Sequence, residues 1–185
     1  MRVVVAITAA SGAIYARQLL KMLIESAEVE RIALIYSENA QAVVAHEGEE
    51  MPSCSEKIEL FANDNLFASP ASGSARWDAM VVVPSSVGTI GRVASGVSQT
   101  LIERAADVML KERRRLIFVV RETPYSLIHL RNMTTLTEAG AVILPATPSF
   151  YSRPQDIEAL CRTVTERVMA MLGLSGERYE WGVKK

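Results

Sequence analysis

The sequence predicts an α/β fold in which helices cover both faces of a parallel β-sheet. Short apolar runs recur along the chain, and segments with helical periodicity separate them. The runs are continuous rather than alternating, which is typical of parallel strands buried on both faces. The chain has 185 residues, the length of one domain. We therefore expect residues 1–185 to form a single domain, with a C-terminal tail at 174–185.

Each expected element follows from one of these patterns. The apolar runs that predict strands are Val3–Ile7, Ile32–Tyr36, Ala79–Val83, Leu116–Val120 and Ala141–Leu144. The helical patterns are Ala13–Ser26, Thr100–Arg113, Ser126–Ala139 and Asp156–Leu172. Alternating strands and helices predict right-handed crossovers, and so a doubly wound sheet in three layers, Rossmann-like or flavodoxin-like. Ligands in such sheets bind beyond the carboxyl ends of the strands, where the strand order reverses.

Two segments interrupt this alternation. The segment from Gly48 to Arg76 is polar and rich in serine and proline, so we expect surface excursions with one irregular helix. The segment from Gly88 to Gly96 is rich in glycine yet apolar. We interpret it as a loop that lets the backbone approach a ligand closely.

The composition limits the possible partners. A formal net charge of −1 argues against a broad nucleic-acid surface or a polybasic membrane anchor, and near-neutrality favours association between copies. No apolar stretch approaches the roughly 20 residues of a membrane span. Cys54 and Cys161 lie far apart, without metal-ligand spacing, and suit a reducing compartment. We therefore expect a cytoplasmic protein that binds neither nucleic acid nor a membrane.

The turn Thr8–Ala13 follows the first strand and opens a helix. Its small side chains let backbone N–H groups approach an anion, and the helix N-terminus adds partial positive charge, so we expect it to bind phosphate. The Ser11 hydroxyl could donate to a phosphate or to a ring nitrogen. The alternative is that Ser11 only caps the helix.

Hydroxyl groups also follow the third strand, in the segment Pro84–Thr89. Hydroxyls beside free backbone amides form a site for an anion, although a serine-rich helix cap explains them equally well. A nucleophilic serine is disfavoured. His46 and His129 lie in helical patterns, and neither has an obvious carboxylate partner for a Ser-His-Asp system.

Charged residues come directly after the fourth strand. Arg121 can offer a planar fork to phosphate, and Glu122 can serve as a general acid or base. The alternative is an Arg121–Glu122 surface pair that contributes very little.

Further cations lie on two of the predicted helices. Arg104 and Lys111 are seven residues apart and share one helix face, which is a solvated face in the simpler interpretation. Tyr151 ends a proline-rich loop after the fifth strand, where core packing is the default role, and Arg167 lies on the next helix. Together with the strand-end residues, these groups suit a phosphate-bearing cofactor and a second phosphate.

The sequence resembles the UbiX-type flavin prenyltransferases, formerly described as small subunits of phenolic acid decarboxylases. The resemblance covers nearly the whole chain. Its most specific part is Arg-Glu-Thr-Pro after the fourth strand, with Phe-Tyr about 25 residues further on. The matching segments are Ala10–Tyr15, Ser85–Thr89, Arg104–Val108, Leu110–Arg114, Arg121–Pro124, Gly140–Pro145 and Phe150–Tyr151.

This resemblance implies a reaction and its partners. Reduced FMN and dimethylallyl phosphate would be joined to give prenylated FMN, with release of phosphate. The product would serve a UbiD-type decarboxylase. Family members form large homo-oligomers, often dodecamers, with sites at subunit interfaces, which would give the solvated Lys111 a role. No metal is expected.

The resemblance also assigns residues. Ser11 would lie near the flavin N5, Glu122 would handle protons, and Tyr151 with Trp181 would shield the prenyl group from water. The FMN ligands would be Ala9, Ala10, Ser11, Ser37, Ser86, Val87, Gly88, Thr89 and Arg121. The prenyl phosphate would be gripped by Arg104, Lys111, Tyr151 and Arg167. One departure is Ala9, which replaces the usual glycine of the first turn.

Two rival functions share the predicted fold. An FMN-dependent cysteine decarboxylase of the phosphopantothenoylcysteine type needs a catalytic histidine, for which His46 is the candidate. A non-catalytic flavin-binding subunit would need the first turn, but not Arg104, Glu122, Tyr151 and Arg167 together.

Overall fold

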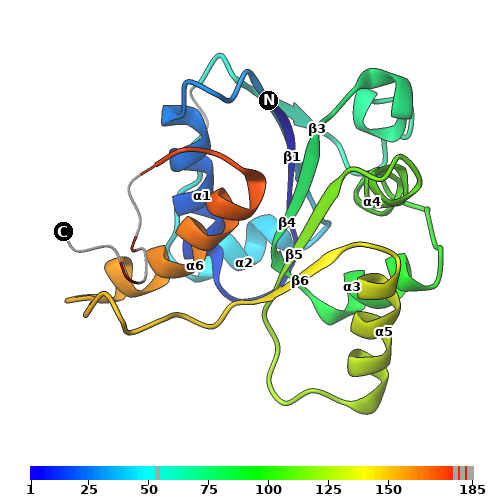
Figure 1. Ribbon diagram of the computed structural model, residues 1–185. Coiled ribbons are helices and arrows are strands. Elements are labelled where there is room, and N and C mark those ends of the chain that lie inside the picture. Colours follow the sequence, from blue (N-terminus) through cyan, green and yellow to red (C-terminus); the bar gives the residue numbers. More distant parts are fainter. Residues whose placement is uncertain (53–54, 177–178, 180–181, 183–185) are drawn as a thin grey trace.

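The computed structural model describes residues 1–52, 55–176, 179 and 182. Across these residues the chain forms one six-stranded parallel sheet in the order β3-β2-β1-β4-β5-β6 (Figure 1). Because the chain moves outward from β1 to β3 and then returns to β4 beside β1, the sheet is doubly wound, as predicted. The strands are β1 (Arg2–Ile7), β2 (Arg31–Tyr36), β3 (Ile58–Phe61), β4 (Ala79–Ser85), β5 (Arg115–Val120) and β6 (Val142–Pro145).

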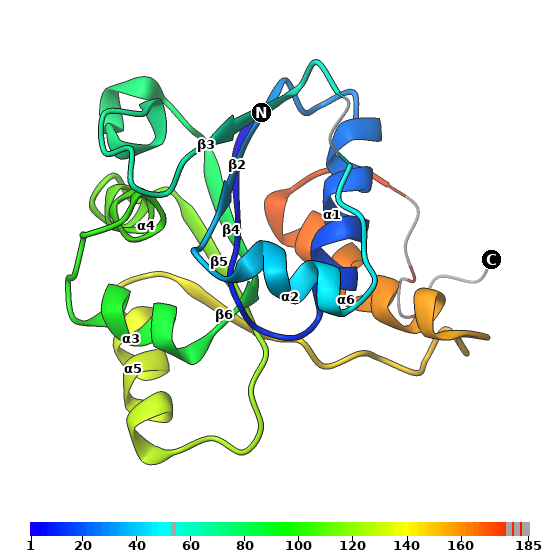
Figure 2. The ribbon, with the colours of Figure 1, turned by 180° about the vertical axis from the view of Figure 1, so that it is seen from behind.

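Helices cover both faces of the sheet and so make three layers (Figures 1 and 2). On one face lie α1 (Ala13–Glu25), α2 (Ala40–His46) and α6 (Ile157–Leu172). On the other lie α3 (Val87–Ala94), α4 (Leu101–Lys111), α5 (Leu127–Glu138) and the short 3-10 turns η1 (Ser69–Ala71) and η2 (Gly73–Ala75). None of these helices has the length and hydropathy that a transmembrane span requires.

Two apolar cores hold the layers together, one on each face of the sheet. Along β1, Val3, Val5 and Ile7 pack toward α1 and α6, while Val4 and Ala6 pack toward α3 and α4. All five are at most 1% exposed, which explains the unbroken apolar run in the sequence. The predicted strands are confirmed to within one or two residues at their ends.

The predicted helix starts are also confirmed, and three of the four predicted helices begin at a polar cap. Thr100 and Ser126 begin α4 and α5 as members of capping boxes, and Asp156 accepts a hydrogen bond from the Ala159 amide at the start of α6.

The interpretation of Gly88–Gly96 as a loop is wrong, because Val87–Ala94 forms α3. The Ser86 side chain caps this helix, and Ile90 and Val93 are buried in the core. The glycines permit close helix packing instead. A Cβ atom at Gly91 would lie 3.2 Å from Asn132 Nδ2 of α5. Glycine marks a tight contact between helices here rather than a mobile connection.

The polar segment 48–76 contains more regular structure than predicted. Ile58–Phe61 forms β3, which pairs with β2 at the edge of the sheet. Because this strand is partly exposed, it lacks the continuous apolar run of the inner strands. The expected irregular helix corresponds to η1 and η2, and α2 was not predicted as a separate element.

One buried side chain joins the two halves of the sheet where the strand order reverses. Thr8 follows β1, is 2% exposed, and donates its hydroxyl hydrogen to the Pro84 carbonyl at 2.7 Å. The same oxygen accepts from the Ser86 N–H at 2.9 Å. Next to this contact the register between β4 and β5 shifts, between Val82 and Ser85. Thr8 therefore fixes the loop after β4 against the turn after β1.

Replacing Thr8 with valine should destabilise the protein at nearly constant side-chain volume. Thr8→Val removes the bond to Pro84 and leaves the Ser86 N–H without its acceptor, which costs about 1–3 kcal/mol in the free energy of unfolding. Urea denaturation measures this. The control is Thr134→Val on α5, whose exposed hydroxyl bonds only to the Leu130 carbonyl of its own helix. Equal stability of the two variants would contradict the role of Thr8.

Candidate functional site

The loops at the carboxyl ends of β1, β2, β4 and β5 lie against one another. The Ser37 N–H donates to the Ile7 carbonyl at 2.9 Å, and the Arg121 N–H donates to the Ser85 carbonyl at 3.1 Å. With the Thr8–Ser86 bond, these contacts bring Ser37, the first turn, Ser86 and Arg121 together. Residues predicted from four separate segments of the sequence thus form one group.

A cavity of about 380 Å³ opens at this position. Its lining includes Ala9, Ser37, Ser86 and Thr89, which were all predicted to bind the flavin. Ser86 also caps α3, since its hydroxyl accepts from the Thr89 N–H at 3.3 Å. The capping interpretation is therefore correct, but it does not exclude an anion. The first N–H groups of a helix have no partner within the helix, and Val87 and Gly88 supply them here.

The amide groups at the start of α1 are already occupied by a carboxylate. Glu47, just beyond α2, accepts hydrogen bonds from the Gly12 N–H at 3.0 Å and the Ala13 N–H at 2.7 Å. Its side chain is also hydrogen-bonded to Ser11. The helix cap is Gly12, in a left-handed conformation, and not Ser11. In this structure the protein's own carboxylate fills the place where the first turn was expected to hold a phosphate.

The surroundings of Glu47 keep it ionised. Burial alone would raise the pKa of this carboxyl group, but hydrogen bonds from Ser11, Ala13 and Gly12 and the nearby charge of Arg121 lower it below its usual value. The Ser11 hydroxyl is thus hydrogen-bonded to an ionised carboxylate.

Sequence reasoning missed Glu47. It is 35 positions from Gly12, and its polar neighbours Gly48, Glu49 and Glu50 give it no distinction. The available signal was indirect. Helix α1 has neither a capping side chain nor an acid in its first turn, so a carboxylate from elsewhere in the chain had to be sought.

Tyr15 marks the inner wall of the same region. Burial, together with a hydrogen bond to Cys161, raises the pKa of Tyr15 to about 12, while the nearby charge of Arg121 lowers it. The charge of Arg121 thus acts on both Tyr15 and Glu47, and the Arg121 backbone N–H bonds to the Ser85 carbonyl at the end of β4. Arg121 is therefore placed at the site despite its position on another strand.

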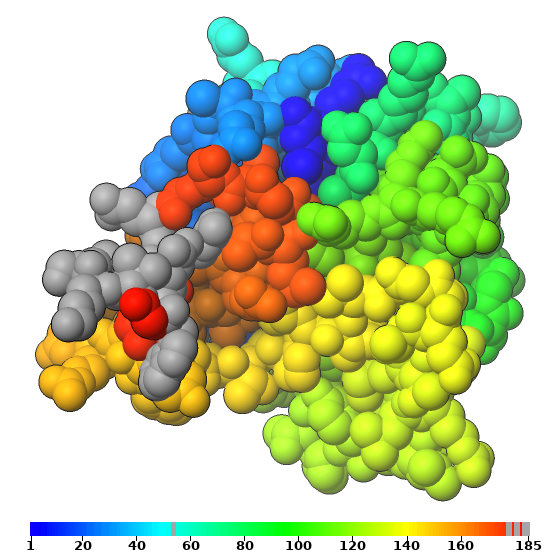
Figure 3. Space-filling view, in the orientation of Figure 1, coloured from blue at the N-terminus to red at the C-terminus, as the bar shows by residue number. Residues whose placement is uncertain are grey.

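The residues predicted to grip the prenyl phosphate do not meet within one chain. Arg167 of α6 lines a cavity of about 860 Å³ beside the loop after β6. Figure 3 shows the segment after β6, in yellow to light orange, next to the darker orange α6. Arg104 and Lys111 lie on α4, across the sheet (Figure 1). The Arg104 side chain bonds to the Ala71 carbonyl and to Asp107. The sheet therefore separates Arg104 and Lys111 from Arg167.

The remaining candidates have clear positions. Tyr151 is 68% exposed and stacks on Tyr179 with ring centres 6.4 Å apart, so the core-packing interpretation is wrong. Lys111 forms an ion pair with Glu112 at 3.0 Å, which agrees with a solvated position in a single chain. Glu122 accepts from the Thr123 N–H at 2.9 Å. Trp181 and Cys54 lie outside the described residues.

His46 and His129 do not line the cavity beside Ser86. His46 is the exposed last residue of α2. His129 belongs to the capping box of α5, where its Nδ1 atom accepts from the Ser126 N–H at 3.1 Å. Within the described parts of the chain, no group of three or more His, Cys, Asp or Glu residues could hold a metal ion.

Comparison with known proteins adds independent information. The Flavoprotein family model matches residues 1–170. The chain is similar to the flavin prenyltransferase UbiX of Methanocaldococcus jannaschii, with 40% identity over 185 residues, 98% of this chain and 99% of that protein.

Solved structures are similar over the same length. AnUbiX (PadA1) in complex with FMN and dimethylallyl pyrophosphate has a TM-score of 0.88 and 40% identity, with 97% of each chain covered. A dodecameric FMN-dependent UbiX-like decarboxylase from Escherichia coli O157:H7 has a TM-score of 0.87 and 33% identity, covering 97% of this chain and 100% of that one.

The Glu47 carboxylate should make a pH-dependent contribution to stability. A carboxyl group whose pKa is lowered on folding stabilises the fold above its unfolded pKa of about 4.3, and this contribution is lost as the pH falls through the folded pKa. Glu47→Gln should therefore be less stable than the wild type at pH 7, and the difference should shrink below about pH 4. Urea denaturation at several pH values measures it.

The matched control is Glu50→Gln, which changes an exposed side chain nearby. This variant should follow the wild type at every pH. A stability difference for Glu47→Gln that is equal at pH 3 and pH 7 would contradict an ionised Glu47.

Proposed function

The chain belongs to the Flavoprotein family and is a flavin prenyltransferase of the UbiX type, and from this premise we propose its reaction and the roles of its residues. The enzyme transfers the dimethylallyl group of dimethylallyl phosphate to reduced FMN, and it releases inorganic phosphate and prenylated FMN. The observation that carries this proposal is the convergence of Ser11, Glu47 and Arg121 beside the cavity that Ala9, Ser37, Ser86 and Thr89 line.

We assign the FMN site to this cavity and the adjoining turn. The small side chains at Ala9 and Ala10 leave room for the flavin, and the hydroxyls of Ser37 and Ser86 offer hydrogen bonds. The start of α3 would hold the flavin phosphate, because the amides of Val87 and Gly88 are at its N-terminus while those of Gly12 and Ala13 are occupied. The assigned ligands are Ala9, Ala10, Ser11, Ser37, Ser86, Val87, Gly88, Thr89 and Arg121.

Ser11 and Glu47 handle the proton at the flavin ring. The reduced flavin supplies an electron-rich ring as the nucleophile, so the protein has to orient it and accept a proton. The Ser11 hydroxyl would lie near the flavin N5, and it is hydrogen-bonded to the ionised Glu47. Arg121 lies close enough to hold Glu47 in its charged form before the proton moves.

A set of cations stabilises the departing phosphate. Negative charge develops on phosphate as its bond to the dimethylallyl group breaks, and cations with hydrogen-bond donors lower the energy of that charge. The groups assigned here are Arg104, Lys111 and Arg167, with the hydroxyl of Tyr151. Glu122 exchanges a proton with the phosphate, and the aromatic ring of Tyr151 excludes water from the reacting prenyl group.

A complete site needs more than one copy of the chain. Arg104 and Lys111 lie on the opposite face of the sheet from Arg167, so a neighbouring copy supplies them. Exposed apolar side chains and a net charge of −1 support association. The exposed side chains include Leu60, Phe67, Leu127 and Ile128. The dodecameric relative supports a homo-dodecamer.

The product and the donor define the partners. Prenylated FMN leaves the enzyme for a UbiD-type decarboxylase in the cytoplasm. The donor is the monophosphate, and dimethylallyl pyrophosphate, which is bound in AnUbiX, is the alternative donor to test.

Neither rival function gains support. His46 is exposed at the end of α2, and a subunit that only binds flavin would not need Tyr151 and Arg167.

The test is an anaerobic reaction of the protein with reduced FMN and dimethylallyl phosphate, with dimethylallyl pyrophosphate in a parallel sample. Mass spectrometry should find a flavin heavier by one prenyl unit. In the sample with dimethylallyl phosphate, a phosphate assay should find an equal amount of released phosphate, whereas transfer from dimethylallyl pyrophosphate would release pyrophosphate. Bound but unmodified FMN in both samples would sink the proposed reaction and favour the non-catalytic subunit.

Glu122→Gln should retain FMN and slow turnover. Removal of a general acid–base group typically reduces the rate by roughly 10²–10⁴, so we expect a loss of at least about tenfold in kcat. Single-turnover measurements of prenylated FMN check this. The control is Glu138→Gln at the exposed end of α5, which should keep the wild-type rate. A fully active Glu122→Gln enzyme would remove Glu122 from the mechanism.

A further inference from the structure

The cavity beside Ser86 has one feature that the assigned FMN ligands leave unused. Of the described residues that line it, Arg92 alone carries a positive charge. Arg92 lies on α3, and its side chain is 49% exposed. A half-exposed arginine in the lining of a flavin cavity is available to a ligand.

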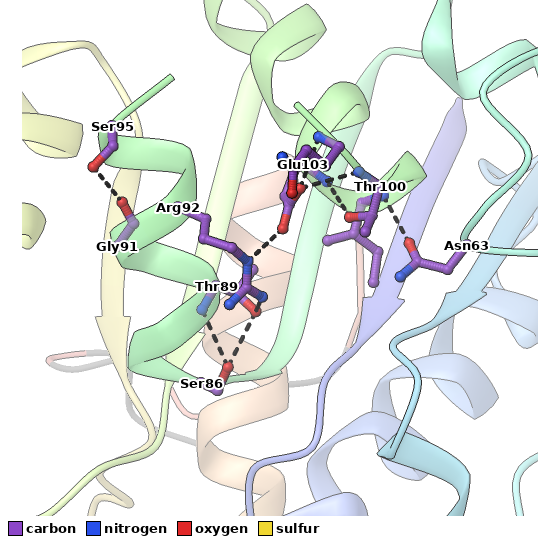
Figure 4. Close-up of polar contacts among 10 residues, drawn as sticks. Asn63, Ser86, Thr89, Gly91, Arg92, Ser95, Thr100 and Glu103 are labelled. Carbon is purple, nitrogen blue, oxygen red and sulfur yellow. Dashed lines mark hydrogen bonds and ion pairs between the residues drawn. The ribbon is translucent and has the colours of Figure 1, made fainter. Parts of the chain in front are cut away.

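The position of the Arg92 side chain is fixed by Glu103. The Arg92 Nε–H donates to Glu103 Oε1 across the gap between α3 and α4 (Figure 4). Glu103 is 2% exposed, and its other carboxylate oxygen accepts from the Gln99 and Thr100 N–H groups, each at 3.0 Å. Burial raises the pKa of Glu103, but the bonds from Arg92, Thr100 and Gln99 lower it below its usual value. An ionised, immobile carboxylate therefore holds Arg92.

The guanidinium group lies along the first turn of α3. Its Nη2 atom donates to Thr89 Oγ1 at 3.3 Å, and a Cβ atom at Gly88 would lie 3.4 Å from Nη1. Figure 4 shows the Arg92 side chain extending back toward Ser86 and Thr89. Arginine has five N–H donors, so the bonds to Glu103 and Thr89 leave others on Nη1 and Nη2 for a ligand.

We propose that Arg92, positioned by Glu103, binds the 5′-phosphate of the flavin and makes the site select FMN over riboflavin. This inference rests on the proposed function. A guanidinium group beside helix N–H groups and hydroxyls matches the shape and charge of a phosphate dianion. Ala9 lines the same cavity and shares its turn with Ser11, so a flavin with its phosphate at Arg92 directs its ring toward Ser11 and Glu47.

The charge balance of the cavity supports this role. Glu38 and Glu103 also line it, and without Arg92 these acids would repel a phosphate. Glu103 is neutralised by Arg92 and two backbone N–H groups, while Glu38 is exposed to water, which screens its charge. Arg92 thus permits an anion to bind between two carboxylates.

The experiment compares two flavins that differ only in the phosphate. Fluorescence titrations with FMN and with riboflavin give the dissociation constants of the wild type, Arg92→Ala, Arg92→Lys and the control Arg31→Ala. Arg31 also forms an ion pair with a glutamate, Glu59, but lies at the amino end of β2, away from the cavity. Thermal unfolding checks that each variant is folded.

We expect Arg92→Ala to weaken FMN binding by about 10- to 100-fold and to change riboflavin binding by less than about threefold, because only the phosphate contact is lost. Arg92→Lys should recover part of the FMN affinity, because lysine keeps the positive charge. The recovery should be incomplete, because lysine lacks the planar guanidinium group that can donate two hydrogen bonds to one phosphate. Arg31→Ala should leave both dissociation constants unchanged.

Two results would overturn the inference: an equal loss of affinity for both flavins in Arg92→Ala, or no loss for either. In both cases the wild type still binds FMN, so the proposed function survives. A wild type that binds neither flavin would instead overturn the proposed function, and the role of Arg92 with it.

Discussion

The hydrogen bonds of Thr8 join the two halves of the sheet at the point where its strand order reverses. One buried hydroxyl donates to the Pro84 carbonyl and accepts from the Ser86 N–H. The turn after β1 and the helix after β4 therefore have a fixed relative position. The ends of β2 and β5 depend on the same junction through the bonds from Ser37 to Ile7 and from Arg121 to Ser85. These contacts bring the four loops of the site together.

The N-termini of α1 and α3 both lie at this junction, and they differ in what contacts their first N–H groups. At α1, Glu47 occupies the N–H groups of Gly12 and Ala13, and so places an ionised carboxylate beside Ser11. At α3, the first turn lies open to a cavity with Arg92 beside it. This asymmetry is the basis of the flavin orientation that we propose, with the ring at Ser11 and the phosphate at the start of α3.

The sequence was a good guide wherever one segment carries its own signal. The inner strands are buried on both faces, so their apolar runs are unbroken, and Thr100, Ser126 and Asp156 cap helices locally. It failed where the signal depends on contacts distant in the chain. The edge strand β3 is partly exposed, and α3 uses its glycines to pack on α5.

The site shows the same limit. Ser11 and Arg121 could be predicted because they directly follow strands, and every such loop reaches the same edge of the sheet. Glu47 could not be predicted, because only the tertiary structure brings it to α1. Arg104 and Lys111 share a helix face, as their spacing predicts, but that face is across the sheet from Arg167. Their joint role depends on an assembly that the sequence of one chain does not encode locally.

The most direct test of this account is a crystal structure of the protein with bound FMN. We expect the phosphate of FMN at the start of α3, within hydrogen-bonding distance of Ser86, Thr89 and Arg92, and the flavin ring over Ser11 with Glu47 still bound to the α1 amides. A phosphate on the Gly12 and Ala13 amides, with Glu47 displaced, would contradict the account.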